Sequence, residues 1–464
     1  MVGYSPVGGQ RIAQVFSTVG KPTITYVERD NGMPEKRLAA SLETPGQVCL
    51  LSGPSKLGKT SLYQEVLPRI RREPLVVRCT GKLTVQNFWA SALERLDFAR
   101  IAERSVEWGS SVTADIGIKG EFGWSWLAKV IPGLSLKIDA SGSLTSTKEF
   151  ARAELSAQHL IPLLKTMPLQ LVVEDFHYLA DDVKQEIFQQ WKSFVDEGVS
   201  VLVVSTTHKS HEMFKANPDL GGRIRILDLS QWSVDDLSKI VDKGLNYLRV
   251  RHGIALRQFV AAESTGVPII TQQICHQFVL DMDLNSYSNH VRRDHHPEHI
   301  KPYVRSVAKE FYAEFERDYD RLCEGPRSKA RKYDTYSLIL SAFVIDPVRF
   351  SLSKTDLMDR INRIVGQNGT VPMASLNSSL KALSGHQKRI GRELLEWQPH
   401  TDMLHILEPT FLFYLRQRVQ EDQESGAGPS NDLIKLINQF GTTPYIRENV
   451  IKRHAGPRIT GRPG

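Results

Sequence analysis

Short apolar runs recur through the first half of the chain and alternate with segments whose apolar residues have helical spacing. The runs lie at 47–51, 74–79, 169–175, 200–205 and 223–229. Each is long enough for one buried strand, and the intervening segments 35–42, 61–70, 85–96, 147–165 and 181–197 fit helices. Strands that alternate with helices predict a parallel sheet covered on both faces. We therefore predict one α/β domain over residues 21–230, in which a strand-like segment at 23–29 comes first.

Residues 105–146 interrupt this domain with another pattern. Apolar and polar residues alternate over 112–118 and again over 134–140, which indicates two half-buried strands. The connection at 122–133 is apolar and rich in aromatic residues. We predict an inserted β-hairpin with a hydrophobic tip. The tip either packs on the protein's own surface or, as large apolar patches often do, contacts another molecule or a membrane.

The second half of the chain changes character at residue 231. Helical patterns at 233–245, 254–264, 268–281 and 303–323 predict a helical lid domain over 231–333. Helices at 336–344, 354–364 and 374–383, followed by strands at 393–397 and 403–407, predict a winged-helix domain over 334–418. We expect a loose N-terminal arm at 1–20. Residues 419–464 are expected to form a linker, polar at 421–430, and a basic tail.

The composition is that of ordinary globular material, with 41% hydrophobic and 24% charged residues in 464. A net charge of +7 permits an acidic partner such as DNA but is spread over a long chain. The four cysteines lie far apart, which predicts reduced thiols rather than a zinc site. No run approaches 18 apolar residues and the start lacks a signal-peptide pattern, so we expect a cytoplasmic protein.

One motif carries a specific chemistry. The chain fits G-x-x-x-x-G-K-[ST], the phosphate-binding loop, at Gly53, Pro54, Ser55, Lys56, Leu57, Gly58, Lys59 and Thr60, with Ser61 next. It stands between a predicted strand and a predicted helix, as this loop requires. The glycines let backbone amides curl round an anion. Lys59 is then expected to reach the phosphates of ATP or ADP, and Thr60 to bind Mg²⁺.

Hydrolysis also needs a second metal ligand and a group that positions water. Glu174 and Asp175 close a predicted buried strand, at the sheet edge where α/β proteins bind ligands. We assign Glu174 to the metal and Asp175 to the water; the reverse assignment is the alternative. Thr206 and Thr207 end the next strand, where Thr207 is the candidate sensor of the γ-phosphate, although threonines are also ordinary strand-end residues.

Other polar residues have weaker signals. Arg223 or Arg225 could contact a nucleotide as an arginine finger, or could be surface charges on an edge strand. Four histidines crowd 290–299, where neighbouring arginines favour a solvated loop over a metal site. A set of basic residues in the predicted winged helix could meet phosphates or simply face water: Lys381, Lys388, Arg389 and Arg392.

Taken together, these motifs resemble those of the STAND ATPases, signal-transduction ATPases related to AAA+ and origin-recognition ATPases. The order is Tyr26-Val27-Glu28-Arg29, the phosphate loop, the strand ending in Glu174-Asp175, Gly266-Val267-Pro268 and a winged helix. The first motif departs from the family pattern, because Glu28 stands for a glycine and Asp30 for a glutamate. The resemblance implies that Tyr26, Val27 and Arg29 border the adenine and that Pro268 lies near the nucleotide.

The resemblance also implies a function. STAND proteins act as switches in which ADP holds a closed monomer and ATP permits oligomerisation, and bacterial members often serve in antiphage defence. We therefore expect a slow ATPase that self-associates with nucleotide and works with an effector or sensor protein. The alternatives are a DNA-binding AAA+-like ATPase of the origin or transposition type, and a scaffold that binds nucleotide without turnover.

Overall fold

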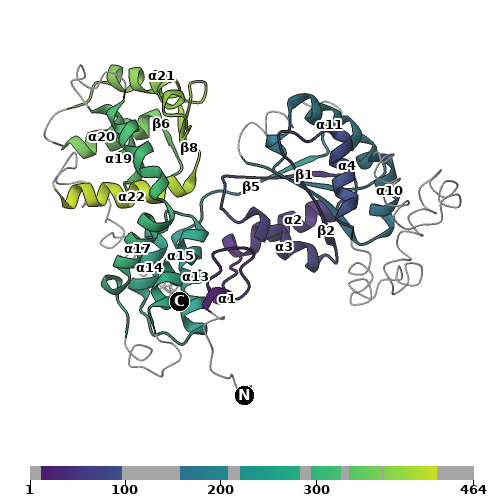
Figure 1. Ribbon diagram of the computed structural model, residues 1–464, viewed down its shortest axis with the longest axis horizontal. Helices are drawn as coiled ribbons and strands as arrows, with labels where there is room; N and C mark the ends of the chain where they lie inside the picture. The colour runs from purple at the N-terminus through teal and green to yellow at the C-terminus, as the bar shows by residue number, and fades with distance from the viewer. Residues whose placement is uncertain are drawn as a thin grey trace, which may run out of the picture. The chain divides into compact units, whose positions relative to one another are not determined.

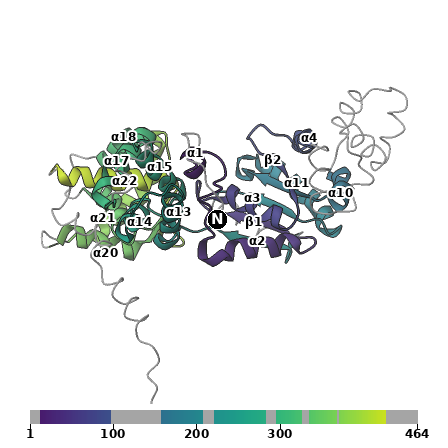
Figure 2. The same ribbon diagram turned by 90° about the horizontal axis from the view of Figure 1, so that it is seen from below.

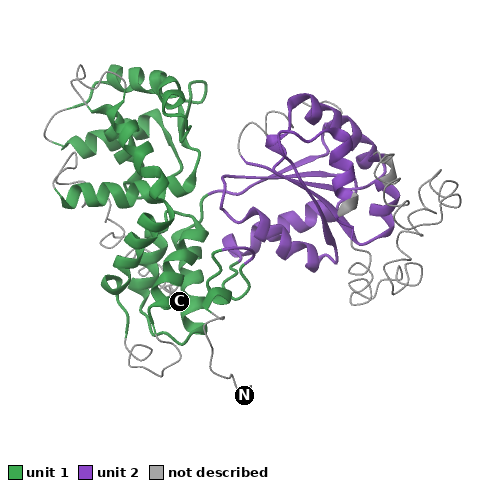
Figure 3. Cartoon of the chain, in the orientation of Figure 1, with its two compact units in different colours: residues 1–18, 22–27, 231–464 green, residues 19–21, 28–230 purple. Residues whose placement is uncertain are grey.

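A computed structural model of the protein describes residues 12–96, 157–206, 220–282, 294–325, 334–366 and 370–425. The chain divides into two compact units, coloured green and purple in Figure 3. Unit 1 comprises Met1–Thr18, Pro22–Val27 and Gln231–Gly464, and unit 2 comprises Val19–Lys21 and Glu28–Ser230. None of the helices in the described ranges combines the length and the apolar character that crossing a bilayer requires.

Unit 2 is built on a five-stranded parallel sheet in the order β2-β3-β4-β1-β5 (Figure 1). The strands are β1 Val48–Ser52, β2 Glu73–Arg78, β3 Leu169–Glu174, β4 Val201–Val204 and β5 Ile224–Asp228. Every residue of β1, β3 and β4 is buried. Such continuous burial is typical of strands covered on both faces, and it explains why these segments are uninterrupted apolar runs. The predicted α/β fold with a parallel sheet is confirmed.

Helices cover both faces of this sheet, as Figures 1 and 2 show. One face carries α2 Met33–Glu43 and α3 Lys59–Arg69, and the other carries α4 Val85–Glu94, α10 Ala157–Thr166 and α11 Asp181–Asp196. Alternate residues of β1 divide between the two cores: Cys49 and Leu51 pack with α2 and α3, while Val48 and Leu50 pack with the other three helices. Both faces of the sheet are therefore packed against helices, and the loops after β1 and β3 start from buried strand ends.

Unit 1 is mainly helical. The α-helices among its described residues up to 324 are α1 Ile12–Val15, α13 Val234–Tyr247, α14 Ile254–Glu263, α15 Pro268–Leu280, α17 Pro297–Phe311 and α18 Glu316–Glu324, with the short 3-10 helix Ala313–Phe315 between the last two. Next come α19 Thr335–Val344, β6 Ser351–Ser353, α20 Lys354–Val365, α21 Met373–Ile390, β7 Leu395–Gln398, β8 Met403–Ile406 and α22 Pro409–Glu424. The three short strands form an antiparallel sheet in the order β6-β8-β7.

The N-terminal predictions need two corrections. Residues 12–18 are not a loose arm, because Phe16 is fully buried and its ring lies against Gly244, where a Cβ atom would approach it to 2.1 Å. Residues 23–28 form no strand. The chain enters α2 instead through a left-handed turn in which Asp30, Asn31 and Gly32 have φ values of 48°, 56° and 76°.

The domain boundaries also differ in part from the prediction. Residues 22–27 group with unit 1 rather than with the α/β domain, and the regions predicted as lid and winged-helix domains fall in one compact unit. The predicted linker is wrong at 419–424, because α22 continues to Glu424. The predicted hairpin at 105–146 and the tail at 426–464 lie outside the described residues.

A buried arginine joins distant segments of unit 1. Arg416 on α22 is 1% exposed, and its Nε and one terminal nitrogen donate to Glu263 Oε1 on α14 at 3.1 and 2.9 Å. The other terminal nitrogen donates to Asp346 Oδ1 at 2.9 Å and to the Val344 carbonyl at 3.1 Å. Two buried carboxylates therefore depend on one guanidinium, so losing it leaves two uncompensated charges.

We expect Arg416→Met to lower the free energy of unfolding by about 3–5 kcal/mol, since removing one partner of a buried ion pair costs roughly that much. The measurement is urea unfolding followed by circular dichroism. Lys309→Met is the control: Lys309 forms an exposed pair with Glu421, and such pairs contribute about 1 kcal/mol or less. Equal midpoints for the two variants would contradict the role given to Arg416.

Candidate nucleotide-binding site

The predicted phosphate loop connects β1 to α3, which begins at Lys59. Gly53 has a φ of 141°, and a Cβ atom there would lie 2.5 Å from the Leu229 carbonyl oxygen. Gly58 has a φ of 89° and caps α3. Both positions therefore require glycine. Residues 54–57 form the bend between them, and the first amides of α3 lack partners within the helix, which suits an anion.

Lys59 lies on the inner side of this loop and is largely buried. Its Nζ donates to the carbonyl oxygens of Gly53 at 2.8 Å and Pro54 at 2.7 Å. Burial lowers the pKa of Lys59 to about 8, and the negative charge of Asp175 opposes this shift. The ammonium group is thus held against the carbonyl oxygens of the loop, where it could turn to a phosphate bound in the loop.

The carboxylate of Glu174 lies beside Thr60 at the carboxyl edge of the sheet. Glu174 is buried, and its Oε1 accepts from the Thr60 hydroxyl at 3.1 Å and from the Tyr63 hydroxyl at 3.0 Å. Burial, reinforced by the Glu174 charge, raises the pKa of Tyr63, so this hydroxyl stays protonated and donates. Thr60 is exposed. A hydroxyl and a carboxylate this close are oxygen donors of the kind that Mg²⁺ takes, so the two predicted metal residues fit that ion.

Arg78 is a site residue that no sequence motif indicates. It is the last residue of β2 and pairs in register with Glu174 on β3. Its Nε donates to Glu174 Oε2 at 3.0 Å, and its side chain is 64% exposed while that of Glu174 is 8% exposed. This bond raises the pKa of Arg78. A cation therefore occupies the second oxygen of the predicted metal ligand.

Asp175 and His177 complete this edge. Asp175 is exposed and takes a left-handed conformation with a φ of 60°, which turns the chain out of β3. His177 follows in the short 3-10 helix Phe176–Tyr178, and its buried Nδ1 has no hydrogen-bond partner among the described residues. Burial lowers the pKa of His177, against the opposing charge of Asp175. A neutral imidazole therefore stands close to the predicted water-positioning acid.

The other predicted catalytic residues are placed less directly. Thr206 follows β4 and is half-buried, and Thr207 lies outside the described residues. Arg225 is exposed on the edge strand β5. Arg223 pairs with Asp196 at 2.6 Å and precedes β5, so it lies at the end of the strand opposite the phosphate loop. That position argues against Arg223 as a ligand of a nucleotide in the same chain.

The predicted adenine-side residues divide between the two units. In unit 2, Arg29 is buried and donates to the Ser230 carbonyl at 3.0 Å. In unit 1, Val27 packs with Leu237, Ile240 and Ala261, and the Tyr26 carbonyl accepts from Lys243 at 2.7 Å. Pro268 opens α15 in unit 1. Their contact with adenine stays a prediction.

The histidine-rich segment shows no metal site in its described part. His295 is buried against Phe278, and His299 Nδ1 accepts from the His296 amide at 3.0 Å, which caps α17. No group of three or more potential metal ligands occurs among the residues that the structure describes. His290 lies outside them. For His295–His299, capping and packing explain the side chains.

No family model matches the sequence, and no curated protein matches it. The fold is similar to that of a Walker-type ATPase of Pyrococcus abyssi, with 14% identity, a TM-score of 0.45, and coverage of 87% of this chain and 99% of that chain. It is also similar to the RuvB Holliday junction branch migration motor of Thermotoga maritima, with 14% identity, a TM-score of 0.37, and coverage of 84% and 97%. A third similar structure is Cdc6p of Pyrobaculum aerophilum, with 14% identity, a TM-score of 0.36, and coverage of 88% of this chain and 98% of that chain. These similarities are distant, and the STAND subtype stays a prediction.

The Arg78–Glu174 pair leads to a prediction about magnesium. A guanidinium and Mg²⁺ would compete for the same carboxylate. Arg78→Met should therefore lower the Mg²⁺ concentration that is needed for half-maximal ATP binding. We expect a decrease of about threefold to tenfold, which is the equivalent of a charged hydrogen bond near the protein surface. Fluorescent ATP titrated at a series of Mg²⁺ concentrations measures this. Arg69→Met, which removes a cation from the far end of α3, should leave the requirement unchanged. A higher Mg²⁺ requirement in Arg78→Met would show that Arg78 helps binding rather than competes.

Proposed function

We propose that this protein is an ATPase that acts as a nucleotide-dependent molecular switch. One observation carries the proposal: the phosphate loop, Lys59, Thr60 and the Glu174-Asp175 pair meet at one edge of the parallel sheet. Lys59 and Thr60 come from the start of α3, and the two acids come from the end of β3. Thr60 and Glu174 are 114 positions apart in the sequence, yet the fold brings them within hydrogen-bond distance.

Each residue then has a distinct task. The loop amides and Lys59 bind and orient the phosphates of ATP. Mg²⁺, when bound by Thr60 and Glu174, supplies positive charge against the phosphate oxygens. Asp175, exposed beside Lys59, orients the attacking water and accepts its proton. His177 follows close to Asp175, and because burial lowers the pKa of His177, its imidazole adds no further positive charge beside Lys59.

The switch part of the proposal rests on the resemblance to STAND ATPases. In that reading, ADP holds the chain as a monomer, while ATP favours a defined oligomer that recruits an effector or sensor protein. Slow turnover would make the nucleotide state long-lived. The Arg78–Glu174 ion pair supports slow turnover, because it holds the metal ligand in a pair with another cation. Antiphage defence is the biological setting that the resemblance suggests.

Turnover and assembly are tested separately. We expect the wild-type protein to hydrolyse ATP slowly, and Asp175→Asn to bind ATP normally while its turnover falls about 100-fold, the usual loss for a general base. Light scattering should show a monomer with ADP and an oligomer with ATP, and the oligomer should persist in Asp175→Asn. Lys59→Met should neither hydrolyse ATP nor form the oligomer. If the protein hydrolyses ATP but its particle mass is the same with ADP and with ATP, the ATPase part of the proposal stands and the switch part is rejected.

A second candidate function is binding of duplex DNA by the C-terminal part of unit 1. The order α19, β6, α20, α21, β7, β8 is that of a winged helix, in which the third helix commonly enters the major groove. That helix, α21, extends to Ile390, seven residues beyond the predicted end, and contains no acidic residue. Lys381, Lys388 and Arg389 are exposed on it. Arg392, by contrast, is tied to Glu408 at 2.7 Å.

If this surface binds DNA, replacing Lys381, Lys388 and Arg389 with glutamine should weaken duplex binding and make the salt dependence shallower by about 0.9 per lost phosphate contact. Fluorescence anisotropy over a range of salt concentrations measures both. A triple variant with Lys36, Lys192 and Lys239 replaced provides an equal change of net charge elsewhere. Equal DNA affinity in both triple variants would remove α21 as the binding surface.

A further inference from the structure

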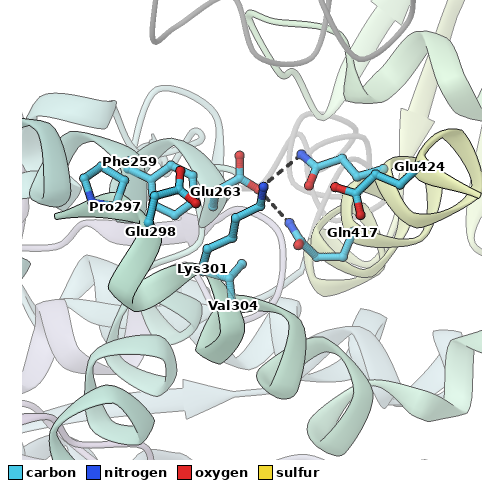
Figure 4. A pocket seen from close by; sticks show the side chains of 9 residues that line it. Phe259, Glu263, Pro297, Glu298, Lys301, Val304, Gln417 and Glu424 are labelled. Atoms are coloured by element: carbon cyan, nitrogen blue, oxygen red, sulfur yellow. Dashed lines mark hydrogen bonds between the residues drawn. The ribbon is translucent and has the colours of Figure 1, made fainter. Parts of the chain in front are cut away.

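A cavity of about 230 Å³ lies between three helices of unit 1 (Figure 4). Each helix contributes residues from one of its faces, spaced about one turn apart. The lining residues are Phe259 and Glu263 on α14, Pro297, Glu298, Lys301 and Val304 on α17, and Gln417, Gln420 and Glu424 on α22. The volume is below the roughly 300–1,000 Å³ of sites for drug-sized ligands, so a nucleotide is excluded and an occupant must be small.

The floor of this cavity is fixed by hydrogen bonds. Glu263 Oε1 accepts two bonds from Arg416, and Glu263 Oε2 accepts from the side-chain amides of Gln417 at 2.6 Å and Gln420 at 3.4 Å. The last two bonds are the dashed lines in Figure 4. This network holds both glutamines with their amide nitrogens on Glu263, which leaves the amide oxygens as acceptors. Both oxygens of this carboxylate already accept hydrogen bonds, and its cationic partner Arg416 is shared with Asp346.

Two charged residues of the cavity wall take no part in this hydrogen-bond network. Glu298 and Lys301 are one turn apart on α17, yet neither side chain forms an ion pair or hydrogen bond with a described residue. Lys301 is half-buried and Glu298 is exposed. The third carboxylate of the wall, Glu424, is already paired with Arg305 at 2.5 Å. One positive and one negative group therefore remain for an occupant, beside the apolar surfaces of Phe259, Pro297 and Val304.

We propose that this cavity is a binding site for a free apolar amino acid no larger than methionine. The carboxylate of the amino acid would pair with Lys301, and its ammonium group would meet Glu298 and the amide oxygens of Gln417 and Gln420. Its side chain would cover Phe259 and Val304. A ligand here touches α14, α17 and α22 together, so it would stabilise unit 1. The proposal is independent of ATP hydrolysis.

The test uses the full chain and single amino acids as probes. Each of glycine, alanine, valine, leucine, isoleucine and methionine is added separately, and thermal unfolding and calorimetric binding are recorded. We expect at least one to bind, and Lys301→Met and Glu298→Gln each to weaken that binding about tenfold or more, the equivalent of one charged hydrogen bond. Both side chains lie outside the Glu263 network, so the variants should fold like the wild type, which their unliganded unfolding temperatures check.

The controls separate the zwitterion from its parts. Lys309→Met and Glu310→Gln change the same charges on α17 outside the cavity, and they should bind the amino acid as the wild type does. The amine that lacks the carboxylate, and the acid that lacks the ammonium group, should each bind at least tenfold more weakly than the amino acid. The proposal is overturned if none of the six amino acids binds, if either cavity variant binds normally, or if the amine or the acid binds as well as the amino acid.

Discussion

The bond between Thr60 and Glu174 is the contact on which the candidate site depends. It joins the start of α3 to the end of β3 across 3.1 Å, and it exists because both β1 and β3 end at the same edge of a parallel sheet. The carboxylate lies at the end of a fully buried strand, so its position is set by the core rather than by a flexible loop. The proposed roles of Thr60 and Glu174 in binding Mg²⁺, and of the neighbouring loop in binding phosphate, depend on this contact.

The surroundings of Glu174 determine how the site works. Tyr63 holds the same oxygen as Thr60, while Arg78 holds the other oxygen from the neighbouring strand. Lys59, whose pKa burial lowers to about 8, rests on two loop carbonyls near the charge of Asp175. A phosphate would therefore meet a desolvated ammonium group, where electrostatic interactions are stronger than in water. A phosphate bound here would lie near a metal ligand that already has a cationic partner.

The sequence was informative where local chemistry restricts the residues. The phosphate loop needs glycines at positive φ and a lysine at a fixed spacing, so it is recognisable from Gly53 to Thr60, and apolar runs revealed all five parallel strands. The pairing of Arg78 with Glu174 was not predictable, because it depends on which strand lies beside β3 and in what register. The left-handed conformation of Asp175 is likewise set by the turn that follows β3.

The helix α22 was missed for a related reason. It is buried almost along its whole first three turns, so it lacks the apolar stripe that marks a surface helix, and its polar residues suggested a linker. Arg416 and Glu263 satisfy one another across 153 positions of sequence, a distance that no local pattern records. The expectation of a loose arm is wrong at 12–18 for the same reason, because Phe16 packs against Gly244 on α13, far away in the sequence.

The central claim is that the loop from Gly53 to Thr60 binds a nucleoside triphosphate through Lys59. Calorimetric titration of the full chain with ATP in the presence of Mg²⁺ tests it most directly, with Lys59→Met as the comparison. The account predicts one nucleotide per chain for the wild type and a loss of about 100-fold or more in affinity for Lys59→Met, as expected for removing a buried charge from a phosphate. Equal affinities for the two proteins, or no binding by the wild type, would contradict it.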